Sequence, residues 1–115
     1  KAHKVLSSSI VVGILPVACG VALGIARRKG KERVHVFVGD ATARTGLFHE
    51  FLQYCDGHAL PVRVVIEDNG MCTNSPTVEG WGSTVECLAD NVEVVTYKYE
   101  RTEAHVGCGT HVTFF

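Results

Sequence analysis

Two short stretches of the sequence place acidic or amide side chains directly after apolar runs. Asp40 follows such a run in "VHVFVGDATARTGLFHEF", residues 34–51, and Asn69 follows another in "VVIEDNGMCT", residues 64–73. The two residues are 29 positions apart. Carboxylate and amide oxygens are ligands that Mg²⁺ prefers, and the ion commonly shares them with the phosphates of a substrate. The pair therefore predicts a site for magnesium with a bound phosphate group.

The segment that follows Asp40 favours the same chemistry, although simpler explanations exist. The sequence "DATARTG", residues 40–46, leads into the expected start of a helix, where backbone N–H groups and the helix dipole attract anions. Asp40 could instead cap a following turn, and Asn69-Gly70 is a turn dipeptide in its own right. The sequence contains neither a GxGxxG run nor a GxxxxGK[ST] loop, which argues against the common nucleotide-binding motifs.

Apolar runs that alternate with segments of helical period predict an α/β fold. We expect strands over residues 33–38, 62–67 and 92–99, helices over 14–28 and 46–56, a Gly/Pro/Ser-rich loop over 69–82, a short helix over 84–89 and strand character over 111–115. Nearly continuous β-branched runs are typical of parallel strands that are covered on both faces. The expectation is one domain, residues 1–115, built as a three-layer sandwich with a mainly parallel sheet. Ligands of such sheets bind outside the carboxyl ends of the strands, where Asp40 and Asn69 both lie.

One apolar segment could be mistaken for a signal peptide or a membrane span. Residues 10–26, "IVVGILPVACGVALGIA", contain no charged residue. The run is shorter than the roughly 20 residues that cross a bilayer, and it contains Pro16 and three glycines. Pro16 suits the first turn of a helix that ends near Arg27 and Arg28, where cations complement the dipole. We therefore expect a helix that is apolar on every side, buried, and not in a membrane.

The overall composition excludes some partners. With 11 basic and 12 acidic residues among 115, the net charge of −1 creates no strong field for nucleic acid or for an anionic membrane. The five cysteines are odd in number and form no CxxC pair, which fits neither a zinc site nor a disulfide framework. We therefore expect reduced, mostly buried thiols in a cytoplasmic protein.

Several motifs together resemble one known family. Gly39-Asp40, then Gly46 and Glu50, then "EDN" at 67–69 resemble the diphosphate-binding motif of thiamine diphosphate-dependent enzymes, in which Gly-Asp-Gly is followed at a set distance by Asn-Asn or Asp-Asn. The upstream "LPVACGVALGIARRKGKERVHVFVGD" is similar to 2-oxo-acid dehydrogenase alpha subunits and to transketolase-like proteins, and "VVTYKYE" is similar to the dehydrogenases. The resemblance covers roughly residues 8–105 and implies the thiamine diphosphate-binding fold.

The resemblance implies thiamine diphosphate and magnesium as cofactors. The side chains of Asp40 and Asn69 and the carbonyl of Met71 would bind the metal. Backbone groups of Gly39, Ala41 and Thr42 would contact the diphosphate. Ala41 departs from the family, which usually has Gly there, and a methyl group is tolerable only if the backbone of Ala41 avoids positive φ.

Two weaker correspondences concern the ends of the matched region. Val11 falls where the family touches the ring region of the cofactor. The family's phosphate-contacting loop histidine corresponds to Thr102, so that His105 would have to take its place. Glu50 matches a family acid near the subunit interface.

The resemblance also implies a partner. The family activates its cofactor with a glutamate from a separate pyrimidine-binding domain, usually across a subunit interface, and this chain shows no such domain. We therefore expect no catalytic residue here, and a pyrimidine-domain partner subunit or a homo-oligomer to complete the site. The small-molecule substrate would be a 2-oxo acid or a ketol donor, which leaves dehydrogenase and transketolase chemistry both open. A regulatory or scaffold homologue that has lost cofactor binding is the alternative.

Overall fold

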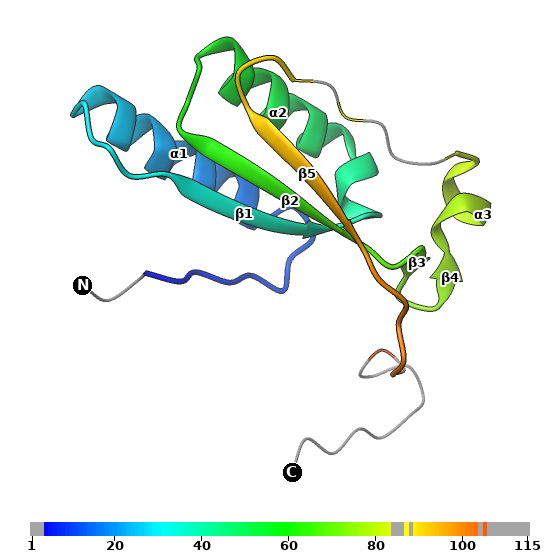
Figure 1. The fold of residues 1–115 in the computed structure, drawn as a ribbon. Helices are drawn as coiled ribbons and strands as arrows, with labels where there is room; N and C mark the ends of the chain where they lie inside the picture. The colour runs from blue at the N-terminus through cyan, green and yellow to red at the C-terminus, as the bar shows by residue number, and fades with distance from the viewer. Residues whose placement is uncertain (1–3, 84–86, 88, 104, 106–115) are drawn as a thin grey trace.

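The computed structural model describes residues 4–83, 87, 89–103 and 105 (Figure 1). In chain order the elements are α1 (Ile14–Arg27), β1 (Val34–Gly39), the 3₁₀ turn η1 (Thr42–Arg44), α2 (Gly46–Gly57), β2 (Val62–Asp68), β3 (Met71–Cys72), β4 (Ser75–Pro76), α3 (Thr77–Trp81) and β5 (Glu93–Lys98). The predicted strand at 111–115 lies outside the described residues, as do positions 84–86 and 88 of the predicted helix over 84–89.

The main sheet has three parallel strands in the order β1-β2-β5. In its register Val36 pairs with Val64, and Val64 pairs with Val94. Strands β3 and β4 form a separate antiparallel pair after β2. Because β1, β2 and β5 run the same way, their carboxyl ends lie at one edge of the sheet (Figure 1). The α/β class and the parallel sheet are confirmed.

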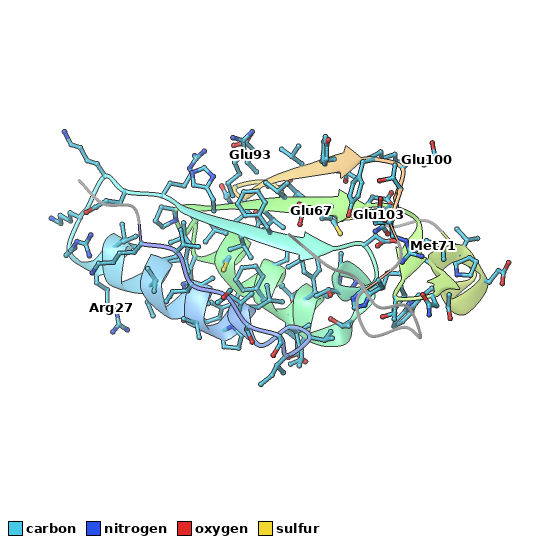
Figure 2. The ribbon with its side chains drawn as sticks, turned by 90° about the horizontal axis from the view of Figure 1, so that it is seen from below. Arg27, Glu67, Met71, Glu93, Glu100 and Glu103 are labelled. Carbon is cyan, nitrogen blue, oxygen red and sulfur yellow. The ribbon has the colours of Figure 1, made fainter. Side chains whose placement is uncertain are left out.

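The core lies between the sheet and two helices. Alternate residues of β1 and β2 are buried, among them Val38, Val64 and Ile66, because successive strand residues point to opposite faces. They belong to one apolar cluster with Leu15 of α1 and Phe48 of α2. Figure 2 shows both helices on the same side of the sheet.

The opposite face of the sheet carries the other set of alternate residues. Phe37 of β1 and Tyr97 of β5 are 59% and 58% exposed on it. In the row that joins His35, Arg63 and Glu93, the guanidinium of Arg63 lies 2.9 Å from a carboxylate oxygen of Glu93. The second helical layer of a three-layer sandwich is therefore not formed by the described residues.

Helix α1 begins and ends close to the predicted positions, with Pro16 in its first turn. It is not buried on every side, however, and that expectation is wrong. Leu15, Ala18, Ala22 and Ile25 face the core, whereas Val17 and Val21 are 47% and 45% exposed, because α1 packs on the sheet along one stripe only. Across the described residues, no helix is long and apolar enough to cross a bilayer.

The cysteines also differ from expectation. Of the four in the described part of the chain, all free thiols, only Cys55 is buried. Cys72 is exposed because it lies in the β3–β4 hairpin, outside the core of the main sheet, and Cys19 and Cys87 are partly exposed. The prediction of mostly buried thiols is therefore wrong for these four, and Cys108 lies outside the described residues.

Candidate functional site

An open pocket of about 570 Å³ lies at the carboxyl edge of the main sheet. Its size falls within the usual range for small-molecule sites, about 300–1,000 Å³. Its lining comes from the ends of all three parallel strands and from the segments that follow them: Asp40, Arg44, Asp68, Asn69, Gly70, Thr77, Val78, Lys98, Tyr99 and Glu100. The structure thus brings Asp40 and Asn69 to one pocket, at the edge where parallel sheets bind ligands.

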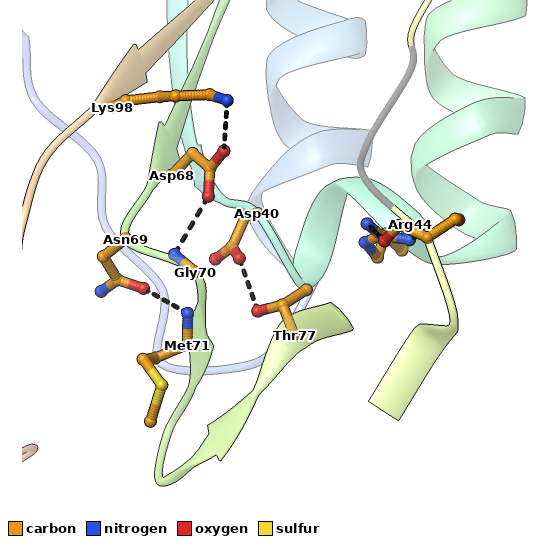
Figure 3. Close-up of polar contacts among 9 residues, drawn as sticks. Asp40, Arg44, Asp68, Asn69, Gly70, Met71, Thr77 and Lys98 are labelled. Carbon is orange, nitrogen blue, oxygen red and sulfur yellow. Dashed lines mark hydrogen bonds and ion pairs between the residues drawn. The ribbon is translucent and has the colours of Figure 1, made fainter. Parts of the chain in front are cut away.

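Asp40 is buried at the end of β1, with only 3% of its surface exposed. Its backbone N–H donates to the carbonyl of Glu67 at 3.2 Å, which extends the β1–β2 ladder. Its side-chain Oδ2 accepts a hydrogen bond from Oγ1 of Thr77 at 2.5 Å (Figure 3). The cap of α2 is Thr45, whose side chain accepts from the backbone N–H of Phe48. The turn that directly follows Asp40, η1, has Ala41 at its N-cap position and no side-chain cap bond, so the described residues do not support Asp40 as a cap of either element.

Asn69 forms the turn that its sequence suggested. Its Oδ1 accepts from the backbone N–H of Met71 at 2.9 Å, and its Nδ2 donates to the hydroxyl of Tyr99 at 3.2 Å. Gly70 has φ +68°, a left-handed conformation that favours glycine, and its N–H donates to Asp68 Oδ1 at 3.0 Å. An amide oxygen has two lone pairs, so the turn leaves Asn69 Oδ1 able to bind a cation as well.

Two cations line the pocket beside these acceptors. Lys98, at the end of β5, places its Nζ 4.0 Å from Oδ2 of Asp68. Arg44, in η1, donates to the side chain and to the carbonyl of Ser83. Its Nε is buried and has no hydrogen-bond partner among the described residues. The pocket therefore offers oxygen donors for a cation together with positive charge for an anion.

The other predicted residues lie around this pocket or away from it. Gly39 and Ala41 flank Asp40, and Thr42 begins η1. Ala41 has φ −66° and ψ −35°, so that its methyl group causes no backbone strain, as the prediction required. Within the described part of the chain, the pocket lining does not include these three residues.

The remaining predicted residues are Met71, Val11 and His105. Met71 begins β3 and contacts the site through its bond to Asn69. Val11 lies before α1 and is 63% exposed, and His105 is exposed near the end of the described residues. None of the three is among the described residues that line the pocket.

The donor set suits magnesium better than a softer metal. In the described ranges no group of three or more His, Cys, Asp or Glu side chains comes together. The predicted set needs only one carboxylate, one amide oxygen and one backbone carbonyl, and Mg²⁺ completes its shell with water and phosphate oxygens. The buried carboxylate of Asp40 and the amide of Asn69 on one pocket fit such an ion, and the cations fit its phosphates.

Of the residues that line the pocket, sequence reasoning predicted only Asp40 and Asn69 as site residues; among those it missed are Arg44, Thr77, Lys98 and Tyr99. A signal for three of them was present. Arg44 lies in the loop directly after Asp40, and Lys98 and Tyr99 end the third parallel strand, where the same rule about carboxyl ends applies. Thr77 had no such signal, because it lies in a segment expected to be loop.

Fold and pocket together define an α/β protein with a pocket of mostly polar residues at the carboxyl edge of a parallel sheet. Residues 1–95 match the family described as the dehydrogenase E1 component, and the chain belongs to that family. The alpha subunit of acetoin:2,6-dichlorophenolindophenol oxidoreductase from Cupriavidus necator is 37% identical over 76 residues. That alignment covers 65% of this chain but 22% of the relative, so the chain spans about a fifth of that protein's length.

The family match confirms the resemblance to 2-oxo-acid dehydrogenases and implies thiamine diphosphate as the cofactor. A diphosphate with a divalent cation would need oxygen ligands for the metal and positive charge near the phosphates. The residues that line the pocket include both kinds of group. The matched residues include Asp40 and Asn69, and they end at position 95, before Lys98 and Tyr99.

Proposed function

We propose that this chain forms the diphosphate- and magnesium-binding part of a thiamine diphosphate-dependent enzyme of the 2-oxo-acid dehydrogenase type. One observation carries the proposal: the buried carboxylate of Asp40 and the amide of Asn69, from two neighbouring strands, line one pocket at the carboxyl edge of the sheet. The family match supports it independently of the geometry.

In this function the residues of the chain bind and orient the cofactor. Asp40, Asn69 and the carbonyl of Met71 hold magnesium, and the backbone of Gly39, Ala41 and Thr42 contacts the diphosphate. Arg44 and Lys98, which line the pocket, offset the negative charge of the phosphates. Val11 and His105 are weaker candidates for cofactor contacts. The bound cofactor supplies the carbanion chemistry on the substrate.

The function requires groups that the described residues do not supply. A pyrimidine-binding partner subunit, or another copy in a homo-oligomer, provides the glutamate that activates the cofactor. The C. necator relative is an alpha subunit, which supports a hetero-oligomer. The family match favours a 2-oxo acid as the small-molecule substrate over the ketol donors of transketolase.

Ligand-dependent thermal stability tests the proposal. The protein expressed from its complete gene, with any subunit that co-purifies, is melted with magnesium and thiamine diphosphate together and with each alone. Ligand at a hundredfold excess over Kd stabilises the native state by about 2.7 kcal/mol. That free energy raises Tm by several degrees. The rise should need both ligands and should disappear in Asp40→Ala.

Asp90→Ala is the matched control, because Asp90 is exposed and lies before the amino end of β5, at the opposite edge of the sheet. It should keep the full rise in Tm. A wild-type protein that shows no magnesium-dependent rise with its partner present would contradict the proposal and favour the non-catalytic homologue. The ordinary backbone angles of Ala41 give no sign of such a loss.

A further inference from the structure

Thr77 differs from the residues around it in being buried. The β3–β4 hairpin and α3 form an exposed extension beyond β2, in which both β4 residues are exposed and Val78 and Trp81 are 52% and 49% exposed. Thr77, the first residue of α3, is 3% exposed. Its position in the fold therefore points the side chain into the molecule, at the pocket.

The hydroxyl of Thr77 has a specific partner there. It donates to Oδ2 of Asp40 at 2.5 Å, across 37 positions of the chain, and both residues are buried (Figure 3). A hydrogen bond to an ionised acceptor is shorter and stronger than one between neutral groups. A buried carboxyl group without a hydrogen-bond partner would be costly, so the bond from Thr77 offsets part of the cost of burying Asp40.

The structure of α3 does not itself require a hydroxyl at this position. The residue before α3, Pro76, makes no side-chain cap, and the backbone N–H of Thr77 already donates to the carbonyl of Gly70 at 2.8 Å. Valine has nearly the same shape as threonine and would fill the same space. The hydroxyl is therefore explained by Asp40 and not by the local fold.

We propose that Thr77 is the positioning residue of the magnesium site, which acts by fixing the carboxylate of Asp40. This inference rests on the proposed function. The bond from Thr77 occupies Oδ2, whereas Oδ1 of Asp40 accepts no hydrogen bond from any described residue. One oxygen is thus held by the protein and the other is left for the cation. Groups that orient a metal-binding carboxylate in this way strongly affect metal affinity.

Thr77 also connects the site to the hairpin. Its backbone N–H bonds to Gly70, the residue directly after Asn69, so that a single residue contacts the segments of both proposed side-chain ligands. Fixing Thr77 therefore fixes the separation of the Asp40 and Asn69 segments as well as the orientation of the carboxylate.

The test measures the Kd of Mg²⁺ at saturating thiamine diphosphate, by calorimetric titration of the protein expressed from its complete gene with its partner. Thr77→Val keeps the shape and removes the donor, and it should weaken magnesium binding about 10–100-fold. Thr77→Ser restores the donor and should recover most of the affinity. Thr96→Val, the same change at an exposed position of β5 outside the pocket lining, should leave Kd unchanged.

The outcomes separate this inference from the proposed function. If Asp40→Ala abolishes binding while Thr77→Val binds like wild type, the positioning role is overturned and the proposed function stands. A lower Tm of Thr77→Val without ligand, together with an unchanged Kd, also overturns it, because that result shows a structural role only. If wild type does not bind magnesium with the cofactor, both proposals fail. Should Thr77→Val not fold, Thr77→Ala removes the donor without adding an apolar group beside the carboxylate.

Discussion

At the scale of single residues, the two proposed side-chain ligands of the candidate site have assigned hydrogen-bond partners. Asp40 is bonded to Thr77, and Asn69 is bonded to Met71 and Tyr99. A buried polar group is costly unless it is hydrogen-bonded, which applies to Asp40, and the bonds of both residues restrict their side chains in the absence of a ligand. Arg44 differs, because its buried Nε has no partner among the described residues. A phosphate oxygen bound in the pocket would be a hydrogen-bond acceptor beside Arg44.

The reactivity of the thiols is a prediction at this scale. Burial, and secondarily the neighbouring Cys19, raises the pKa of the Cys55 thiol to about 12. Because the thiolate is the nucleophile, Cys55 should react with iodoacetamide at pH 8 at least about tenfold more slowly than exposed Cys72. Mass spectrometry of the digested protein measures both rates, and denaturant should bring them together. Equal rates in the native protein would contradict the buried position of Cys55.

The site residues show how far a sequence can predict a site of this kind. Asp40 and Asn69 could be predicted because each ends an apolar strand, and parallel strands bring their carboxyl ends together. Thr77 could not, because its contact with Asp40 spans 37 positions and depends on how the hairpin after β2 folds back. From the sequence, Asn69-Gly70 could be either a turn or part of a metal site. The structure shows the turn, in which Oδ1 of Asn69 accepts one hydrogen bond and keeps a second lone pair for a metal ion.

At the scale of elements, the strongly patterned segments were predicted closely and the short ones were not. Helix α2 and strands β1, β2 and β5 begin and end within one or two residues of the predicted ranges. Their positions follow from the helical spacing of apolar residues and from runs of β-branched residues, both of which are visible in the sequence. The segment 69–82 was predicted as loop, whereas it contains β3, β4 and α3. Strands of two residues have no period to detect, and their pairing depends on the turn between them.

One side chain connects two elements and gives a prediction that depends on pH. Asp56, near the end of α2, accepts from the backbone N–H groups of Asn91 and Val92 at 2.6 and 2.9 Å, just before β5. These bonds hold the pKa of Asp56 below its ordinary value of 3.8. Asp56→Ala should therefore lower Tm at pH 7, and Asp56→Asn, which keeps one acceptor oxygen, should lower it less.

The sign of the pH effect follows from the lowered pKa. The unfolded chain binds the proton more readily than the folded chain does, so the stabilisation by Asp56 is complete above about pH 4 and is lost as the pH falls through the lower folded pKa. The difference in Tm between wild type and Asp56→Asn should therefore shrink as the pH falls from about 4 to about 3. A constant difference across that range would show that the charge of Asp56 makes no contribution.

At the scale of the whole molecule, the described residues form a sheet with one helical layer and a pocket at its carboxyl edge. Helices α1 and α2 cover one face of the sheet, while Phe37 and Tyr97 remain exposed on the other. Most of the residues that line the pocket have charged or polar side chains, and Val78 is the one aliphatic residue that the described part of the chain contributes to it. These side chains offer charge, hydrogen-bond donors and acceptors, which suit a metal ion and phosphates.

The polar lining of the pocket predicts which half of the cofactor the chain recognises. Magnesium with methyl diphosphate, which lacks the rings, should raise Tm by several degrees and should compete with thiamine diphosphate, because in the proposed function the pocket lining binds the metal and the phosphates. Free thiamine, which lacks the diphosphate, should leave Tm unchanged at the same concentration. Thermal melts of the protein without its partner subunit compare the three ligands directly. Stabilisation by thiamine alone would show that this chain binds the rings, and the division of the site between two subunits would then be wrong.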